Sequence, residues 1–485
     1  MDEKIIKTSI DKLKAIIYKN VKRKKYDRAL SNIYACASIL YSVNYVFVDE
    51  DLENALRDIA GTFNIKVNTQ NDDGSIIFYD GFGLNDRGLA QIYLKALTKC
   101  YRVIYITDEK NKCNIPDILD IVYKNGEVVY LKKKKLYDKV VELQKIVDDN
   151  CPGKFIFYSY PQDVVGITCM HMYNGIIDRY NINLTDHAFW LGTKAIDYNI
   201  EFRDYGASIS KLHRGIDEKK LIKNPFYPNI NQNIEFEGFP FDENQKKIIF
   251  SGGSLYKTFG DNNKYYYMVE QILQENDNVI FWYAGTGDSS ELDKLKNKYK
   301  DRVFQTKERR DLYQVLKHSD LYLSTYPICG GLMFQYAAAA CKVPITLKYD
   351  DISNDFLNNQ SELNIEFDEL EPLLCEVKKL LSDDAYMYNR CKEIGAAVTT
   401  EDQFNAGVEK VFGKNVGEYI HYNDDTKIAI KDEYIKNYTM KKFCDNITSK
   451  WTIDIGIHFL KESILSVIIK FARVAKRIKN KVFYR

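Results

Sequence analysis

The sequence predicts an α/β protein of two domains, each built on a doubly wound parallel sheet and facing a common cleft, with a helical extension before them and a helical tail after them. Three observations predict this class. The 485 residues exceed a single domain of the usual size, about 100–200 residues. Short apolar strands alternate with amphipathic helices, and the alternation stops and restarts near residue 240. A hydrophobic fraction of 45% can fill large cores, which excludes a disordered or fibrous chain.

Charge and cysteine spacing exclude further classes. Lys and Arg total 69 against 68 Asp and Glu, so no overall field draws the molecule to nucleic acid. The ten cysteines form no CxxC pair, as expected for reduced thiols in a cytosol. The six histidines have no ligand spacing, so we expect no metal site. The N-terminus lacks the apolar core of a signal peptide, and no run reaches the ~18–20 apolar residues of a membrane span.

Residues 1–70 are predicted to be a helical extension, since apolar residues recur at helical spacing and Gly61 is a suitable stop. These apolar residues are Leu30, Ile33, Ala37, Leu40 and Tyr41. The first sheet domain follows over residues 71–240. It opens with a βαβ unit: a strand at Ile76–Asp80, a loop GFGLNDRG, a helix at Leu89–Lys99 and a strand at Arg102–Thr107. Further strands at KFIFYSY and IIDRYNINL and a helix at Lys135–Val147 continue the pattern.

The second sheet domain, over residues 241–410, shows the clearest alternation in the chain. Its strands and helices are KIIFSGG, YYYMVEQILQ, NVIFWYAGTG, LDKLKNKY, DRVFQT, RRDLYQVLKHS, DLYLST, CGGLMFQYAAAAC and VPITL. Ligands of such sheets bind beyond the carboxyl ends of the strands, which predicts a ligand cleft between the two domains.

Residues 411–485 are predicted to be a C-terminal extension ending in a basic amphipathic helix over about 457–480. Residues 451–485 hold eight Lys or Arg against Asp454 and Glu462, a net charge of +6. A helix of this kind binds an anionic membrane surface through its basic face. We therefore expect a cytoplasmic protein attached peripherally to the inner face of the plasma membrane. The alternative is that this helix packs on the body of the protein.

Three places in the second domain pair glycines with the end of a strand or the start of a helix. They are Gly252 and Gly253, with Ser254 and Lys257 just beyond; Gly285 and Gly287; and Gly330 and Gly331. Glycines let a diphosphate approach the backbone, and a helix start offers free N–H groups and the positive end of the dipole. The expected ligand is a nucleotide. The alternative for each pair is a tight turn, and for the alanines after Gly331 it is packing on the sheet.

The segment LTDHAFWLG of the first domain places Asp186 beside His187. A histidine oriented by a carboxylate can accept a proton from an acceptor hydroxyl, or as imidazolium steady a leaving phosphate. Asp186 or His187 is therefore the candidate catalytic base. A lone histidine is more often structural, in which case the Asp80–Arg87 loop is the next place to seek a base.

Together these segments resemble bacterial glycosyltransferases of the GT-B fold, which have two Rossmann-like domains and act in surface-polysaccharide synthesis (capsule, O-antigen, exopolysaccharide). The resemblance runs from about Ser75 to residue 410 and rests on FYDGFGLNDRG, LTDHAFWLG, PFYP, FSGGSLYKTFG, FWYAGTG and STYPICGGLMFQYAAAACKVP. It implies transfer of a hexosyl group from a nucleotide sugar, a UDP-sugar being favoured, to a glycan or lipid-linked glycan, without metal or other cofactor. By position it implies that Lys257 faces the donor diphosphate, that Gly330, Gly331, Leu332 and Met333 cap it, and that Gly285 lies beside the nucleoside.

The sequence departs from the retaining members of this fold. Those members carry a Glu-x7-Glu motif on the helix that here begins with CGGLMF, and Cys329 and Ala337 stand in place of the two glutamates. The Gly-Gly start is closer to inverting members, which need an acceptor-side base and electrostatic help at the leaving diphosphate. Two alternatives stay open: a catalytically silent subunit of the same fold that binds a partner enzyme or glycan, and a CDP-polyol phosphotransferase of teichoic-acid type.

Overall fold

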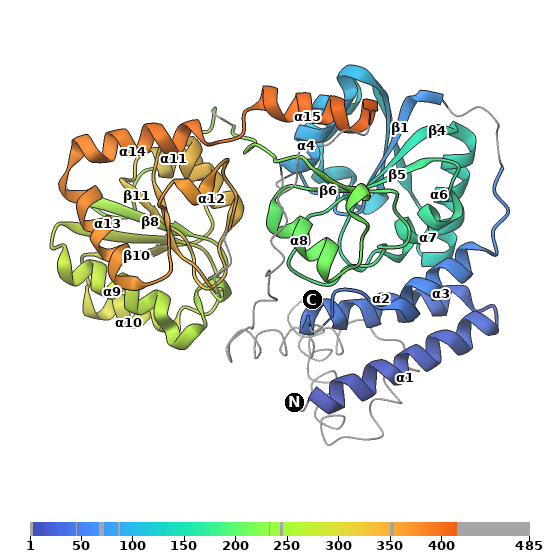
Figure 1. Ribbon diagram of the computed structural model, residues 1–485, viewed down its shortest axis with the longest axis horizontal. Helices are drawn as coiled ribbons and strands as arrows, with labels where there is room; N and C mark the ends of the chain where they lie inside the picture. The colour runs from blue at the N-terminus through green and yellow to red at the C-terminus, as the bar shows by residue number, and fades with distance from the viewer. Residues whose placement is uncertain are drawn as a thin grey trace, which may run out of the picture. The chain divides into compact units, whose positions relative to one another are not determined.

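The computed structural model describes residues 3–414, apart from positions 45, 67–71, 86–87, 232, 243–245 and 350–353. Within these residues the chain forms two compact α/β units, one of residues 3–200 and 210–221 and one of residues 201–209 and 222–414. Each unit contains one sheet with helices packed on it (Figure 1), as the sequence predicts. The predicted basic helix of the tail lies outside the described residues.

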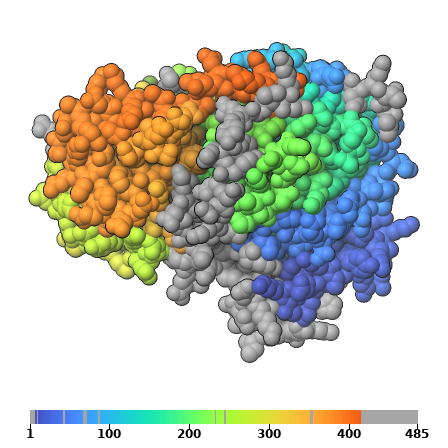
Figure 2. All heavy atoms as spheres, viewed as in Figure 1, coloured from blue at the N-terminus to red at the C-terminus, as the bar shows by residue number. Residues whose placement is uncertain are grey.

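The predicted helical extension consists of α1 (Glu3–Lys22), α2 (Tyr26–Val43) and α3 (Glu50–Ala60). Of the five apolar residues predicted at helical spacing in α2, Leu30, Ile33, Ala37 and Leu40 are buried at 0% exposure, whereas Tyr41 is only partly buried. Helix α2 packs on α6 (Leu136–Asn150), and α3 packs on α7 (Val164–Met172). The extension is therefore an integral layer of the first unit, and in Figure 2 its blue atoms adjoin teal atoms of that unit.

The first sheet has the strand order β3-β2-β1-β4-β5-β6-β7, and β1 to β6 pair in parallel. Its strands are β1 (Asp72–Asp80), β2 (Arg102–Asp108), β3 (Gly126–Leu131), β4 (Pro152–Tyr158), β5 (Asp178–Ile182), β6 (Tyr198–Glu201) and β7 (Leu221–Lys223). The remaining helices of this part of the chain are α4 (Leu89–Cys100), α5 (Pro116–Val122) and α8 (Asp204–Leu212). The strand order reverses between β1 and β4, so the loops that follow these two strands diverge and leave a crevice at the carboxyl edge.

The second sheet has the order β10-β9-β8-β11-β12-β13, with all neighbours parallel. Its strands are β8 (Lys247–Gly252), β9 (Val279–Ala284), β10 (Val303–Thr306), β11 (Leu321–Leu323), β12 (Pro344–Leu347) and β13 (Glu366–Phe367). The helices of this part of the chain are α9 (Lys264–Glu275), α10 (Ser290–Lys298), α11 (Leu312–Lys317), α12 (Gly331–Ala339), α13 (Leu370–Ser382), α14 (Asp384–Ala396) and α15 (Glu401–Lys414). The nine segments predicted from the sequence of this domain are all present.

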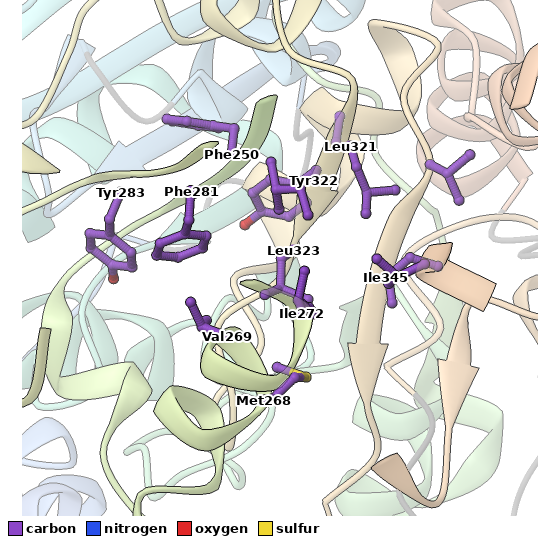
Figure 3. Close-up of a cluster of buried hydrophobic side chains, with 14 of the residues drawn as sticks. Phe250, Met268, Val269, Ile272, Phe281, Tyr283, Leu321, Tyr322, Leu323 and Ile345 are labelled. Carbon is purple, nitrogen blue, oxygen red and sulfur yellow. The ribbon is translucent and has the colours of Figure 1, made fainter. Parts of the chain in front are cut away.

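The core of the second unit is built from the strands of its sheet and the apolar face of α9. Figure 3 shows Phe281, Tyr283 and Leu323 of the strands above Val269 and Met268 of α9. All five side chains are almost completely removed from solvent. Burial of apolar surface on this scale holds the strands in register, so the carboxyl ends of β8, β9 and β11 are fixed relative to one another.

Candidate functional site

The glycines predicted to mark a ligand site lie at the carboxyl ends of β8 and β9 in the second unit. The N–H of Gly253 donates to the carbonyl of Ala284 at 3.0 Å, and the N–H of Leu255 donates to the carbonyl of Thr286 at 3.0 Å. A Cβ atom on Gly285 would lie 1.9 Å from the carbonyl oxygen of Gly253, so no side chain fits there. Close approach of two backbones thus explains Gly285, and its place beside a nucleoside stays a prediction.

Lys257 lies on the short 3-10 helix η4 (Leu255–Thr258) that follows these turns. Its ammonium is directed at the start of α12, since a Cβ on Gly330 would lie 3.8 Å from Lys257 Nζ. Burial lowers the pKa of Lys257. Among the described residues its ammonium has no hydrogen-bond or ion-pair partner. A half-buried cation without a protein partner is costly unless a ligand supplies the negative charge, so the position suits an anion.

Helix α12 begins without a side-chain cap, because its N-cap residue is Gly330. Its first N–H groups are therefore available to an anion. The two glycines differ in surroundings. A Cβ on Gly330 would meet only ordinary contacts from 3.7 Å outward, whereas one on Gly331 would lie 2.4 Å from the ring of Phe356. Gly331 makes room for Phe356, and Gly330 is the glycine that faces Lys257. Leu332 is exposed and Met333 is partly buried in the first turn.

Arg203, which the sequence did not single out, lies on the Phe356 side of α12. Its guanidinium stacks over the ring of Phe356 at 4.5 Å and donates to the carbonyl of Asn354 at 2.7 Å. The side chain is only 8% exposed. The same Phe356 ring packs against Gly331, so Arg203 lies near the start of α12. Lys257 lies at Gly330, and two positively charged side chains are therefore found near this helix start. Nothing in the EFRDYG segment indicates that Arg203 belongs to this site, because its hydrogen-bond partner Asn354 is 151 positions away in the sequence.

Cys329 precedes Gly330 and is the residue that stands where retaining transferases have a glutamate. Burial raises the pKa of its thiol to about 12, although Ser324, Lys257 and Arg203 all favour the thiolate. Its sulfur lies 3.1 Å from the Ser324 hydroxyl oxygen. The thiol is therefore neutral at physiological pH and is unsuited to act as a nucleophile.

Asp355 is a second residue at this place that the sequence did not indicate. Its Oδ2 accepts the N–H of Tyr205 at 3.1 Å, while its Oδ1 is buried without a partner among the described residues. Burial raises the pKa of this carboxyl to about 6. The carboxyl therefore changes its protonation near neutral pH, next to the phenyl ring that packs on α12.

Asp186 and His187, the candidates for the catalytic base, lie in the first unit, in the turn between β5 and β6. Asp186 Oδ1 lies 3.2 Å from His187 Nδ1, the Asp186 side chain is 2% exposed, and that of His187 is 54% exposed. The structure therefore brings the two predicted residues together, with a buried carboxylate orienting an accessible imidazole. This is the arrangement that a general base requires.

Three polar side chains from other parts of the unit hold this turn. The Asn44 amide donates to the carbonyl of His187 at 3.1 Å and accepts the N–H of Phe189 at 3.0 Å. The buried Arg214 donates to three carbonyls, those of Thr185, Asp186 and Ala188, at 2.7–2.9 Å. The buried Glu53 accepts the N–H groups of Gly192 and Lys194 at 2.7 and 3.4 Å. A turn fixed at both ends in this way holds its side chains in one geometry.

Asp80, in the loop considered as the next place for a base, has a structural role. Its Oδ1 accepts the N–H groups of Phe82 and Gly83 at 2.9 Å, and its Oδ2 accepts the Tyr105 hydroxyl at 2.6 Å. The carboxylate is completely buried and caps the turn after β1. Asp86 and Arg87 of the same loop lie outside the described residues.

In the part of the chain that the structure describes, no group of three His, Cys, Asp or Glu residues is arranged to hold a metal ion. Over the same residues no helix is long and apolar enough to cross a membrane.

The two parallel-sheet units define a two-domain GT-B fold with a helical N-terminal extension. No family model and no curated protein matches the sequence. Among solved structures, a mutant of the O-GlcNAc transferase of Thermobaculum terrenum superposes with a TM-score of 0.55 at 14% identity, over 84% of this chain and 81% of that one. A glycosyltransferase from Rickettsia africae superposes with a TM-score of 0.50 at 10% identity, over 70% of this chain and 99% of that one. Likeness at these identities establishes the fold, and the reaction has to be inferred from the site.

Proposed function

We propose that the protein is a glycosyltransferase that binds the diphosphate of a nucleotide sugar at the start of α12. The observation that carries this proposal is the Lys257 ammonium, which lies beside the uncapped helix start and has no partner in residues 3–414 as far as these are described. The buried Arg203 adds a second positive charge at the same place. The two fold neighbours, both named as transferases of sugars, support the same class.

In the proposed reaction an acceptor hydroxyl attacks the anomeric carbon as the bond from that carbon to the diphosphate oxygen breaks. The negative charge that develops on the leaving diphosphate is stabilised by Lys257 and the first N–H groups of α12. The proton of the hydroxyl passes to His187, which Asp186 orients. One displacement of this kind inverts the configuration at the anomeric carbon. We propose that the reaction needs no metal, because the helix start and two cations supply positive charge.

The acceptor and the cellular setting form a further part of the proposal. A glycan on a lipid carrier at the inner leaflet, in the synthesis of a surface polysaccharide, fits the basic amphipathic pattern of residues 451–485. A protein confined to that surface would meet its acceptor by a two-dimensional search.

Donor binding tests the proposal. The full chain is titrated with UDP-, GDP-, CDP- and dTDP-linked donors, and the rise in melting temperature is recorded, since a ligand of the folded state raises it. We expect a UDP-sugar to give the largest shift and to be consumed when a glycan acceptor is added. A shift with CDP-ribitol or CDP-glycerol alone would favour the polyol phosphotransferase. Donor binding without turnover would favour the silent subunit, and no shift with any donor would refute the proposed site.

A further inference from the structure

A pocket of about 360 Å³ lies in the first unit where the strand order reverses. Tyr79 and Gly81 line it from the end of β1, and Tyr160 lines it from the loop after β4. Open α/β sheets bind ligands at this topological position, and the volume is within the range of small-molecule sites, about 300–1,000 Å³. Neither Asp186 nor His187 lines the pocket, so the pocket is separate from these candidate catalytic residues.

The walls of the pocket are fixed by contacts that do not involve a ligand. Asp163 caps α7 by accepting the N–H groups of Val165 and Gly166 at 2.8 and 3.1 Å, and its other oxygen accepts the Ser159 hydroxyl. Ser31 and Tyr34 of α2 close the pocket on the side of the helical extension. The site is therefore preformed, which lowers the entropic cost of binding.

The lining combines aromatic faces with hydroxyl groups. The Tyr160 hydroxyl has no hydrogen-bond partner among the described residues, and its ring meets the edge of Tyr34 at a centroid distance of 6.3 Å. Asp108 is paired with Lys139, so this carboxylate is already neutralised. Tyrosine offers an apolar face and a polar tip at once, which matches a sugar ring, with its C–H faces and its rim of hydroxyls.

The same structure argues against a phosphate as the ligand. Two helix starts border the pocket, that of α7 through Val165 and that of α6 through Leu136 and Lys139. The Asp163 carboxyl already occupies the first N–H groups of α7, and the Asp27 carboxyl accepts the N–H of Tyr137 in the first turn of α6. A phosphate there would meet a carboxyl group in place of free donors. The exposed Lys110 is the one lining cation without a carboxylate partner in the described part of the chain.

We propose that this pocket binds a neutral pyranose ring, a sugar of the acceptor glycan other than the one whose hydroxyl reacts, with α2 as its roof. Its identification with the acceptor rests on the proposed function, whereas the binding of a neutral sugar stands on the pocket itself.

Saturation-transfer NMR on the full chain, with free glucose and N-acetylglucosamine as probes, tests the binding. Tyr160→Phe keeps the ring and removes the unpartnered hydroxyl, so we expect sugar affinity to fall about 2- to 12-fold, the effect of one hydrogen bond. Ser31→Phe places a ring in the pocket from α2 and should abolish binding. Tyr123→Phe, on an exposed tyrosine that does not line the pocket, is the matched control and should have no effect.

Melting temperature and UDP binding are measured on every variant, so that a failure of folding is recognised. Unchanged sugar binding in Tyr160→Phe together with Ser31→Phe would overturn the inference, as would absence of binding of either sugar to the parent protein, or competition by inorganic phosphate. The proposed function is tested separately by transfer. Sugar binding that both pocket variants weaken, in a protein without transferase activity, would leave the pocket assigned and refute the enzyme.

Discussion

Lys257 is the residue on which the proposed donor site depends most. We expect Lys257→Ala to weaken nucleotide-sugar binding about 10- to 100-fold, the effect of losing a charge-assisted hydrogen bond. The melting temperature should stay unchanged or rise, because the ammonium has no partner to lose in the part of the chain that the structure describes. Calorimetric titration measures the affinity, and Lys317→Ala on the exposed side of α11 serves as the control. Equal donor affinity in both variants would exclude Lys257 from the site.

The lowered pKa of Lys257 gives the donor affinity a pH dependence. Only the charged ammonium attracts the diphosphate, so affinity should fall as the pH rises through this lowered pKa, earlier than for an ordinary lysine. In Lys257→Arg the charge persists to high pH, since guanidinium does not deprotonate in proteins. Affinity measured between pH 7 and 10 should therefore decline in the parent protein and stay level in the arginine variant.

His187 is the residue on which the proposed sugar transfer depends most, as donor binding depends on Lys257. His187→Ala should abolish transfer and leave donor binding intact, because the imidazole lies in the first unit and the donor residues lie in the second. Asp186→Asn should impair transfer in the same way if the carboxylate orients the ring. Near parental turnover in both variants would make the turn structural, and the stereochemistry of the product, read by NMR, decides separately whether the reaction inverts.

At the scale of single elements, the start of α12 offers a matched pair of substitutions. Gly331→Ala should destabilise the protein by about 1–3 kcal/mol, because the added methyl overlaps the Phe356 ring and overpacks the contact. Gly330 has a φ of −92°, and a Cβ atom there would make only ordinary contacts. The substitution Gly330→Ala should therefore change the free energy of unfolding little. Urea denaturation compares the two. A larger loss in Gly330→Ala would contradict the packing described here.

The elements that the sequence predicted are those with a strong pattern of their own. Strands such as β8 and β9 are apolar runs that end in glycines, and α2 has an amphipathic period. Strand β3 escaped prediction because it is mostly half-exposed. Helix α7, VVGITCMHM, escaped because it is apolar on nearly every side, so no period separates it from a strand. The sequence indicated the glycine turns and the Asp186–His187 pair, whereas Arg203, Asp355 and the pocket depend on segments that meet only in the fold.

At the scale of the whole molecule, we propose that the basic tail of residues 451–485 holds the protein at a membrane. It lies outside the described residues, so the prediction comes from its sequence. Replacing Arg473, Lys476 and Arg477 by Glu should abolish co-sedimentation of the full chain with anionic vesicles at low salt, since each basic residue contributes on the order of 1 kcal/mol at such a surface. Donor binding should be unchanged. Equal sedimentation of the parent and the charge-reversed protein would place the attachment elsewhere.

Helix α2 contributes to two separate places, since its middle roofs the pocket with Ser31 and Tyr34 and its C-cap residue Asn44 holds the turn of His187. Eighteen residues of helix are a rod of roughly 27 Å, too well packed to bend independently at its two ends. Opening of this rod would expose the pocket and release the turn in one cooperative event. A sugar bound under α2 would therefore slow amide hydrogen exchange in the distant residues 187–189 as well as around the pocket, and one part of the acceptor would stiffen the turn that carries the proposed base.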